Sequence, residues 1–110
     1  MDEIKKFIDE NKVAGNGMSL LTAANCLEAL EILERHSIPI HGFDAFNVES
    51  SIKIPIGWTQ EIKHSSVQPN QLYSRDYSDL EKNQALLLCR EYFLNDKVEN
   101  VLYELAFPGM

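Results

Sequence analysis

The sequence predicts a small α+β domain in which three helices pack on one small, mainly antiparallel β-sheet. Apolar residues recur at helical spacing in the stretch expected over residues 80–94, which makes it the clearest helix of the chain. From Ser51 to Trp58, apolar and polar residues alternate strictly, as they do in a strand with one buried face. A length of 110 residues is typical of one domain, so residues 1–110 are expected to fold as a single unit.

Two helices are expected in the first third of the chain. A short first helix ends by about Lys12, ahead of a turn predicted at Gly15–Gly17. The second helix is expected from Ser19 or Thr22 to His36. Its apolar side is formed by residues one helical turn apart, namely Ala23, Cys26, Leu27, Leu30 and Leu33.

Three strands are expected to form the sheet, over residues 38–48, 51–64 and 98–107. In the first of these, Gly42 marks a bend or a bulge. If alternation continues through Gly42, Phe46 faces inward with Ile38, whereas a bulge there moves Phe43 inward instead. The second strand contains a proline and is therefore expected either at an edge or with a distortion. The third strand is apolar on both faces, which favours an inner position in the sheet, packed on the helix over residues 80–94.

The helix over Leu80–Leu94 is expected to be the central element, with its cap at Ser78 or Asp79. Beyond its first turn, only Arg90 and Glu91 give it a charged side. A helix this apolar is expected to be covered on more than one face, with the rest of the chain packed around it. Its main apolar side holds Ala85, Leu88, Cys89 and Tyr92, and Leu86, Leu87, Phe93 and Leu94 extend it.

The composition limits the classes of partner. The chain has a formal net charge of -7, which opposes direct contact with nucleic acid or with an anionic membrane surface. The acidity serves solubility, or it attracts a basic protein. Cys26 and Cys89 both lie among apolar residues, and we expect buried, free thiols. With no signal peptide or membrane span in the sequence, a cytoplasmic location is expected.

Motifs of catalysis and of cofactor binding are missing from the sequence. The histidines, His36, His41 and His64, do not fall in a zinc-binding pattern, and the two cysteines lack metal-ligand spacing. No phosphate-binding or nucleophile-elbow motif occurs. Because Cys89 lies in an apolar helix, its thiolate is disfavoured. We therefore expect no cofactor, no metal and no catalytic residue.

A protein-binding surface is the functional feature that the residues favour. Between Ser65 and Ser78 the sequence is polar and is predicted to form a loop. Tyrosine and arginine alternate with acids in this region, a composition typical of protein interfaces. Trp58 offers a second anchor, although a core position is the alternative for Trp58 and an ordinary solvated loop is the alternative for the tyrosines.

The order of these signals resembles that of small immunity proteins of bacterial polymorphic toxin and contact-dependent growth inhibition systems. The segments that carry the resemblance are Leu27–Leu33, Ser37–Phe46, Asp76–Asp79 and Val101–Leu105, within a match from about Leu20 to Phe107. The resemblance implies a protein that binds and blocks a cognate toxin domain, without a cofactor or catalytic residues. Many such toxins are basic nucleases and their inhibitors tend to be acidic. Because toxin contacts vary within these families, the resemblance assigns no contact residue.

The sequence hypothesis is therefore stoichiometric inhibition of the C-terminal domain of a cognate toxin, with no direct contact to nucleic acid, membrane or small-molecule substrate. Two alternatives stay open, an adaptor or regulatory domain that binds another protein, and a small enzyme that uses carboxylates, His41 or His64. The candidate toxin-binding residues, chosen as charged groups and aromatic anchors, are Asp44, Trp58, Glu61, Tyr73, Arg75, Asp76, Tyr77 and Asp79.

Overall fold

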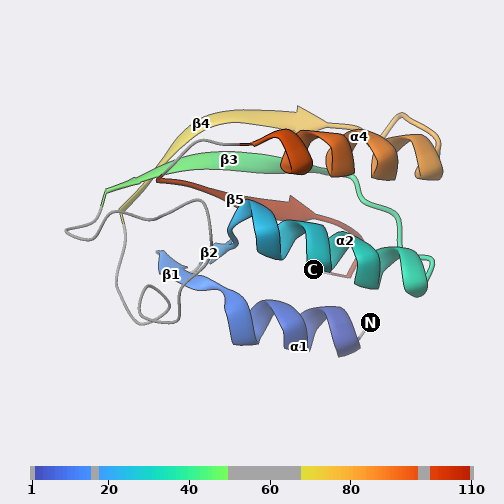
Figure 1. The fold of residues 1–110 in the computed structure, drawn as a ribbon, viewed down its shortest axis with the longest axis horizontal. Helices are drawn as coiled ribbons and strands as arrows, with labels where there is room; N and C mark the ends of the chain where they lie inside the picture. Colours follow the sequence, from blue (N-terminus) through green and yellow to red (C-terminus); the bar gives the residue numbers. More distant parts are fainter. Residues whose placement is uncertain (1, 16–17, 50–67, 97–99, 110) are drawn as a thin grey trace.

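The fold is organised on a three-stranded antiparallel sheet with the strand order β4-β3-β5 (Figure 1). The computed structural model describes residues 2–15, 18–49, 68–96 and 100–109. The strands of the sheet are β3 (Gly42–Glu49), β4 (Gln68–Asp76) and β5 (Val101–Ala106). The helices of the described residues are α1 (Asp2–Asn11), α2 (Ala23–Arg35) and α4 (Lys82–Asn95). The predicted α+β fold class, with three helices packed on a mainly antiparallel sheet, is confirmed.

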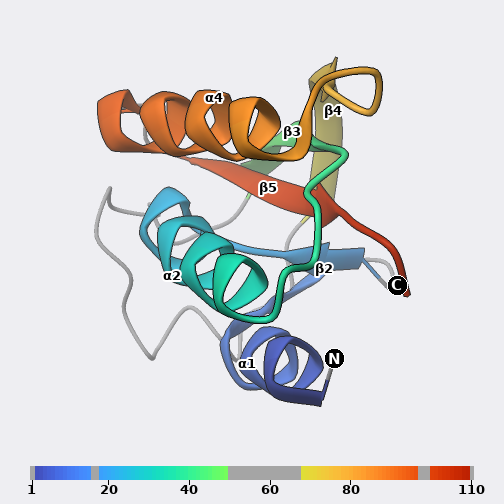
Figure 2. The ribbon, with the colours of Figure 1, turned by 90° about the vertical axis from the view of Figure 1, so that its right-hand side faces the viewer.

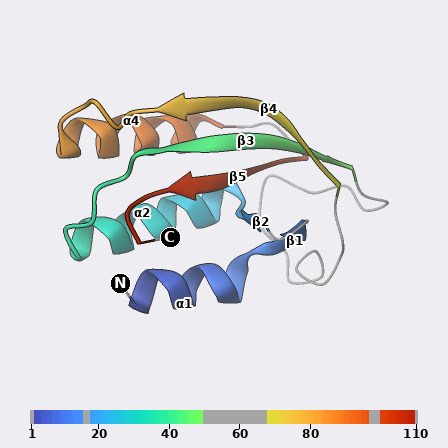
Figure 3. The same cartoon turned by 180° about the vertical axis from the view of Figure 1, so that it is seen from behind.

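The helices form a layer on one side of the sheet. α2 and α4 lie side by side on it, and α1 packs against α2 (Figure 2). Seen from behind, the strands lie in front of α2 and α4 (Figure 3). The main core lies between these two layers and includes Ile4, Cys26, Ala29, Leu30, Leu33, Phe43, Ala45, Ala85, Leu86, Cys89, Phe93, Tyr103 and Leu105.

Phe43 lies at the centre of this core and is only 2% exposed. Its ring centroid is 4.8 Å from those of Tyr92 and Phe93, 5.7 Å from Tyr103 and 6.4 Å from Tyr77. Of the two arrangements that the sequence left open, the one with Phe43 facing inward is therefore correct. The pairing of β3 with β5 sets Phe46 opposite Leu102 and Phe43 opposite Leu105, so Phe46 faces the other side of the sheet.

A short hairpin that the sequence did not predict covers part of this other side. β1 (Val13–Gly15) pairs antiparallel with β2 (Met18–Leu20). The residue after β2, Leu21, exchanges two backbone hydrogen bonds with Tyr103, of 2.7 and 2.8 Å, and so joins the hairpin to the outer edge of β5. The hairpin forms a second core with the sheet, consisting of Val13, Leu20, Phe46, Val48 and Leu102.

The helix ends follow local capping chemistry. Thr22 Oγ1 accepts the Asn25 backbone N–H at 3.1 Å and His36 is the C-cap, so the second helix has the predicted bounds. The predicted cap of α4 at Ser78 or Asp79 is wrong, because Glu81 accepts the Gln84 N–H at 3.2 Å instead. The backbone N–H and hydroxyl of Ser78 donate to Asp76, which forms a separate turn before the helix.

The burial of α4 also differs from the prediction that more than one of its faces is covered. Leu86 is 8% exposed, but the neighbouring Leu87 is 51% exposed and Leu94 is 55% exposed. Among the described residues, α2 and the sheet contact the side of α4 that carries Ala85 and Cys89, and none covers the side that carries Leu87 and Leu94.

The sheet itself contains a strand where the sequence predicted a loop. β4 occupies residues 68–76, and a β-bulge interrupts its pairing with β3 between Ala45 and Phe46. Pro69 is compatible with β4 because this strand is at the edge of the sheet. The prediction that β5 is an inner strand is wrong, because β3 takes the centre. The strand predicted over residues 51–64 lies outside the described residues.

Candidate functional site

The predicted site residues on β3 and β4 divide between the two faces of the sheet. The register sets Asp44 opposite Ser74 and Tyr73 opposite Ala45. Because side chains alternate along a strand, Tyr73 and Arg75 share the face that the helices cover, whereas Asp44 and Asp76 face the other side. The structure therefore brings the predicted residues near one edge of the sheet without forming a single surface from them.

The tyrosines chosen as anchors are half-buried and pack on the core. The Tyr73 ring lies 6.3 Å from the Tyr92 ring, and the Arg75 guanidinium lies 4.5 Å above the Tyr73 ring. This stacking is a cation–π contact. The Tyr77 ring meets the buried Phe43 ring edge to face. Both tyrosines therefore hold the edge of the sheet against α4, and only part of each ring is available to a partner.

The predicted acids make local hydrogen bonds or are free in solvent. The Asp44 carboxylate accepts the Ser74 hydroxyl at 2.5 Å. The Asp76 carboxylate accepts the Ser78 hydroxyl at 2.7 Å and the Ser78 N–H at 3.0 Å, and these bonds lower the pKa of Asp76. Asp79 is exposed in the turn that follows. Trp58 and Glu61 lie outside the described residues.

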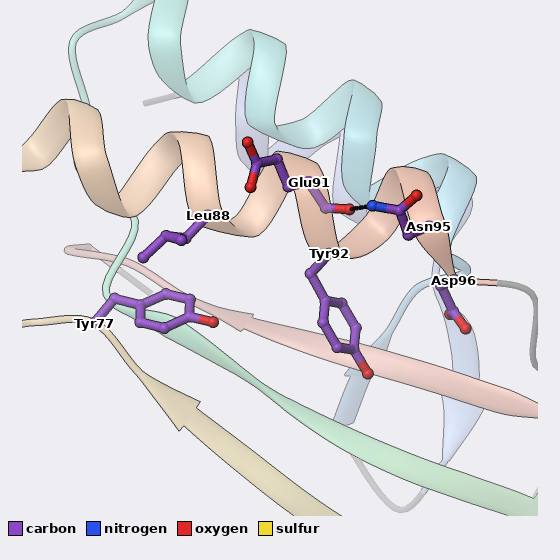
Figure 4. A pocket seen from close by; sticks show the side chains of 6 residues that line it. All are labelled: Tyr77, Leu88, Glu91, Tyr92, Asn95 and Asp96. Atoms are coloured by element: carbon purple, nitrogen blue, oxygen red, sulfur yellow. Dashed lines mark hydrogen bonds between the residues drawn. The ribbon is translucent and has the colours of Figure 1, made fainter.

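The concave site nearest to these residues is a groove between α4 and the end of β4, with a volume of about 470 Å³. Figure 4 shows Leu88 and Tyr92 of α4 on the side of Tyr77, whereas the Glu91 side chain is turned away from the sheet. We call it the α4 groove, and its lining residues are Tyr77, Leu88, Glu91, Tyr92, Asn95 and Asp96. The sequence hypothesis included Tyr77 alone. The spacing of Leu88, Glu91, Tyr92 and Asn95 at i, i+3, i+4 and i+7 places them on one side of a helix, a signal that could have been used.

Contacts with the buried Tyr103 hold two lining residues of the α4 groove, Tyr92 and Asp96. The buried Tyr103 hydroxyl donates to the Asp96 carboxylate, and the Tyr92 and Tyr103 rings meet edge to face with their centroids 5.9 Å apart. Burial raises the pKa of both Tyr77 and Tyr92, so both phenols are neutral at physiological pH. The groove therefore presents neutral phenols and carboxylates, which suit a cationic or hydrogen-bonding group of a partner.

The thiols and histidines of the described residues do not form a nucleophilic pair. Cys26 and Cys89 are free and buried, as predicted. Burial raises the pKa of Cys89 to about 12, so its thiol is protonated at neutral pH. His36 Nε2 lies 2.6 Å from the Glu3 carboxylate, on the surface between α1 and α2. His41 is exposed at the start of β3, and His64 lies outside the described residues.

The described residues contain neither a metal-binding cluster nor a membrane-spanning helix. Residues 2–15, 18–49, 68–96 and 100–109 hold no cluster of three or more histidine, cysteine or acidic side chains that could bind a metal ion. None of the helices described is both long enough and apolar enough to span a membrane.

Comparison with known proteins adds no assignment, since no family model, no curated protein and no solved structure matches this chain.

Proposed function

We propose that this protein is an immunity protein, which binds the C-terminal domain of a cognate bacterial toxin and blocks it by occupying its surface. The observation that carries the proposal is the α4 groove, where phenols and carboxylates from two elements meet at the surface of a chain with a net charge of -7. A basic protein domain is the partner whose charge complements this surface. The resemblance of the sequence to small immunity proteins supports the same partner class.

Inhibition of this kind needs only a stable complex. Tyr77 and Tyr92 have most of their ring area packed on the core, so little side-chain entropy is lost when a partner contacts them. The acids steer a basic domain toward the surface, and the pre-formed groove then holds a side chain of that domain. The proposal places the protein in the cytoplasm, where its two free thiols stay reduced.

The test is growth rescue by co-expression. The reading frame directly upstream of this gene is sequenced, and the C-terminal domain that it encodes is expressed in a host with and without this protein. We expect the domain alone to stop growth, and the pair to grow and to co-purify as a complex. Continued growth arrest in the presence of a well-expressed, folded protein contradicts the proposal. A complex with a domain that is not toxic indicates an adaptor instead.

A further inference from the structure

The outer face of α4 carries large apolar side chains that nothing in the described structure covers. Leu87 is 51% exposed and Leu94 is 55% exposed, although both lie in the middle or last turn of a regular helix. They are seven residues apart and thus lie on one side of the helix, opposite the buried Cys89. Single exposed leucines are ordinary on protein surfaces, but two on one helix face form an apolar patch.

Glu91 connects this patch to the α4 groove. It follows Leu87 by four residues and precedes Leu94 by three, so it is next to both on the helix surface. It also lines the groove, and Figure 4 shows its carboxylate turned away from the sheet. We call the continuous surface formed by Leu87, Leu88, Glu91, Leu94 and Asn95 the α4 docking face.

A second copy of this chain is a poor match for the α4 docking face. In a two-fold pair of antiparallel α4 helices, Leu87 would meet Leu94 of the other copy, and the two Glu91 carboxylates would lie close together between them. The neighbouring Arg90 does not offset this repulsion, because its guanidinium is bonded to Glu34 of α2 at 3.1 Å. Two chains that each carry a net charge of -7 also repel one another.

We propose that the α4 docking face binds a basic amphipathic segment of the toxin domain. Apolar side chains of that segment cover Leu87 and Leu94, and a lysine or arginine between them pairs with Glu91 at the rim of the α4 groove. This inference rests on the proposed function and goes further, because it names the surface and the chemistry of the segment bound. It also moves the interface from the residues that the sequence hypothesis chose, among them Tyr73, Arg75 and Asp76 of β4, to the helix.

The experiment measures how tightly matched variants of this protein bind the toxin domain that is encoded upstream. The toxin domain is obtained by denaturing its complex with the wild-type protein and is then refolded. The test variants are Leu87→Asp and Glu91→Lys. The control for the first is Leu72→Asp, because Leu72 on β4 is also 51% exposed. The control for the second is Glu31→Lys, which makes the same charge change at an exposed position of α2. We expect each test variant to weaken binding at least about tenfold and each control to stay within about twofold.

Circular dichroism and size-exclusion chromatography accompany each titration. If Leu87→Asp is not folded, Leu94→Asp replaces it at the other end of the patch. Failure of the wild-type protein to bind or protect overturns the proposed function. Wild-type protection with equal binding by test and control variants overturns the α4 docking face alone. A wild-type dimer that Leu87→Asp converts to a monomer assigns the face to a second copy and also overturns the inference.

Discussion

Gly42 shows how one residue determines the path of the chain at the start of the central strand. Its φ angle is 149°, a conformation that residues with a side chain rarely adopt. A Cβ atom at this position would lie 2.0 Å from the carbonyl oxygen of Arg75 on β4. The sequence predicted a bend or bulge here, and the structure adds the reason: only glycine allows β4 to approach this closely.

We therefore expect Gly42→Ala to lower the free energy of unfolding by on the order of 3 kcal/mol, from backbone strain and from the displacement of β4. Urea unfolding followed by circular dichroism measures the change. Asn47→Ala, at an exposed position of the same strand, is the control and should change the stability by less than about 0.5 kcal/mol. Equal stability of the two variants would show that β3 and β4 are not held as closely as described.

Tyr103 makes the stability sensitive to alkaline pH. Burial, followed by its hydrogen bond to Asp96, raises the pKa of this phenol above its ordinary value of 10. The folded protein therefore retains a proton that the unfolded chain loses. The contribution of Tyr103 to the free energy of unfolding is fully present below the pKa of the unfolded chain, and it is lost as the pH rises beyond that value. Cys89, whose pKa burial raises to about 12, acts in the same direction from about pH 9 upward.

Urea unfolding at neutral pH and at about pH 10.5 tests this expectation. The wild-type protein should be less stable at the higher pH, and Tyr103→Phe should lose less stability between the two. At neutral pH the variant should be about 1–2 kcal/mol less stable than wild type, because Asp96 loses a buried donor. A Tyr103→Phe protein with the full alkaline loss would assign the effect to the thiols and to Tyr77 and Tyr92, whose pKa values are also raised by burial.

At the scale of the element, α4 has a sharp boundary between its buried and exposed sides. Leu86 and Leu87 are adjacent leucines, one 8% and the other 51% exposed. The residue types alone predicted cover on more than one side, because leucine spacing does not reveal how many elements surround a helix. Only the contacts of α4 with α2 and the sheet decide which leucines are buried.

This adjacent pair provides a direct stability test. Leu86→Ala should lower the free energy of unfolding by about 2–5 kcal/mol, because it removes core contacts and leaves a cavity. Leu87→Ala should change it by no more than about 0.5 kcal/mol, since helix propensity favours alanine and little burial is lost. Urea unfolding of both variants measures the difference. Similar losses in both would mean that the outer side of α4 is covered in the isolated protein.

β4 shows the limit of local prediction at the same scale. Its residues are polar and contain a proline, so nothing in the segment alone predicts a strand. In the structure it pairs with β3 along eight residue pairs, interrupted by one bulge. Strand formation depends on such partners far along the chain, so the pairing outweighs the low strand propensity of the segment. The hairpin of β1 and β2 was missed for a related reason, since three-residue strands are too short to show alternation.

At the scale of the whole molecule, we expect the net charge of -7 to govern the rate of association with the basic toxin domain that we propose as the partner. Raising the salt concentration from about 0.05 M to about 0.5 M shortens the screening length several-fold. We expect the association rate with the toxin domain to fall at least about tenfold over this range, with a smaller change in the dissociation rate. Stopped-flow mixing of the two proteins measures the rates. An association rate that does not depend on salt would exclude electrostatic steering.

The sequence by itself determined the α+β class, the bounds of α2, the strand character of β3 and β5, and the buried thiols. These features depend on local chemistry, namely apolar spacing, the Thr22 cap and alternation. The tertiary structure alone decided that β3 is central, that β4 is a strand, and that Tyr77 and α4 side chains form one groove. The physical reason is that these features need contacts between segments far apart in the chain. The spacing of residues within one segment shows which side chains can share a face of a helix or strand. Packing between segments determines which of these faces stays exposed.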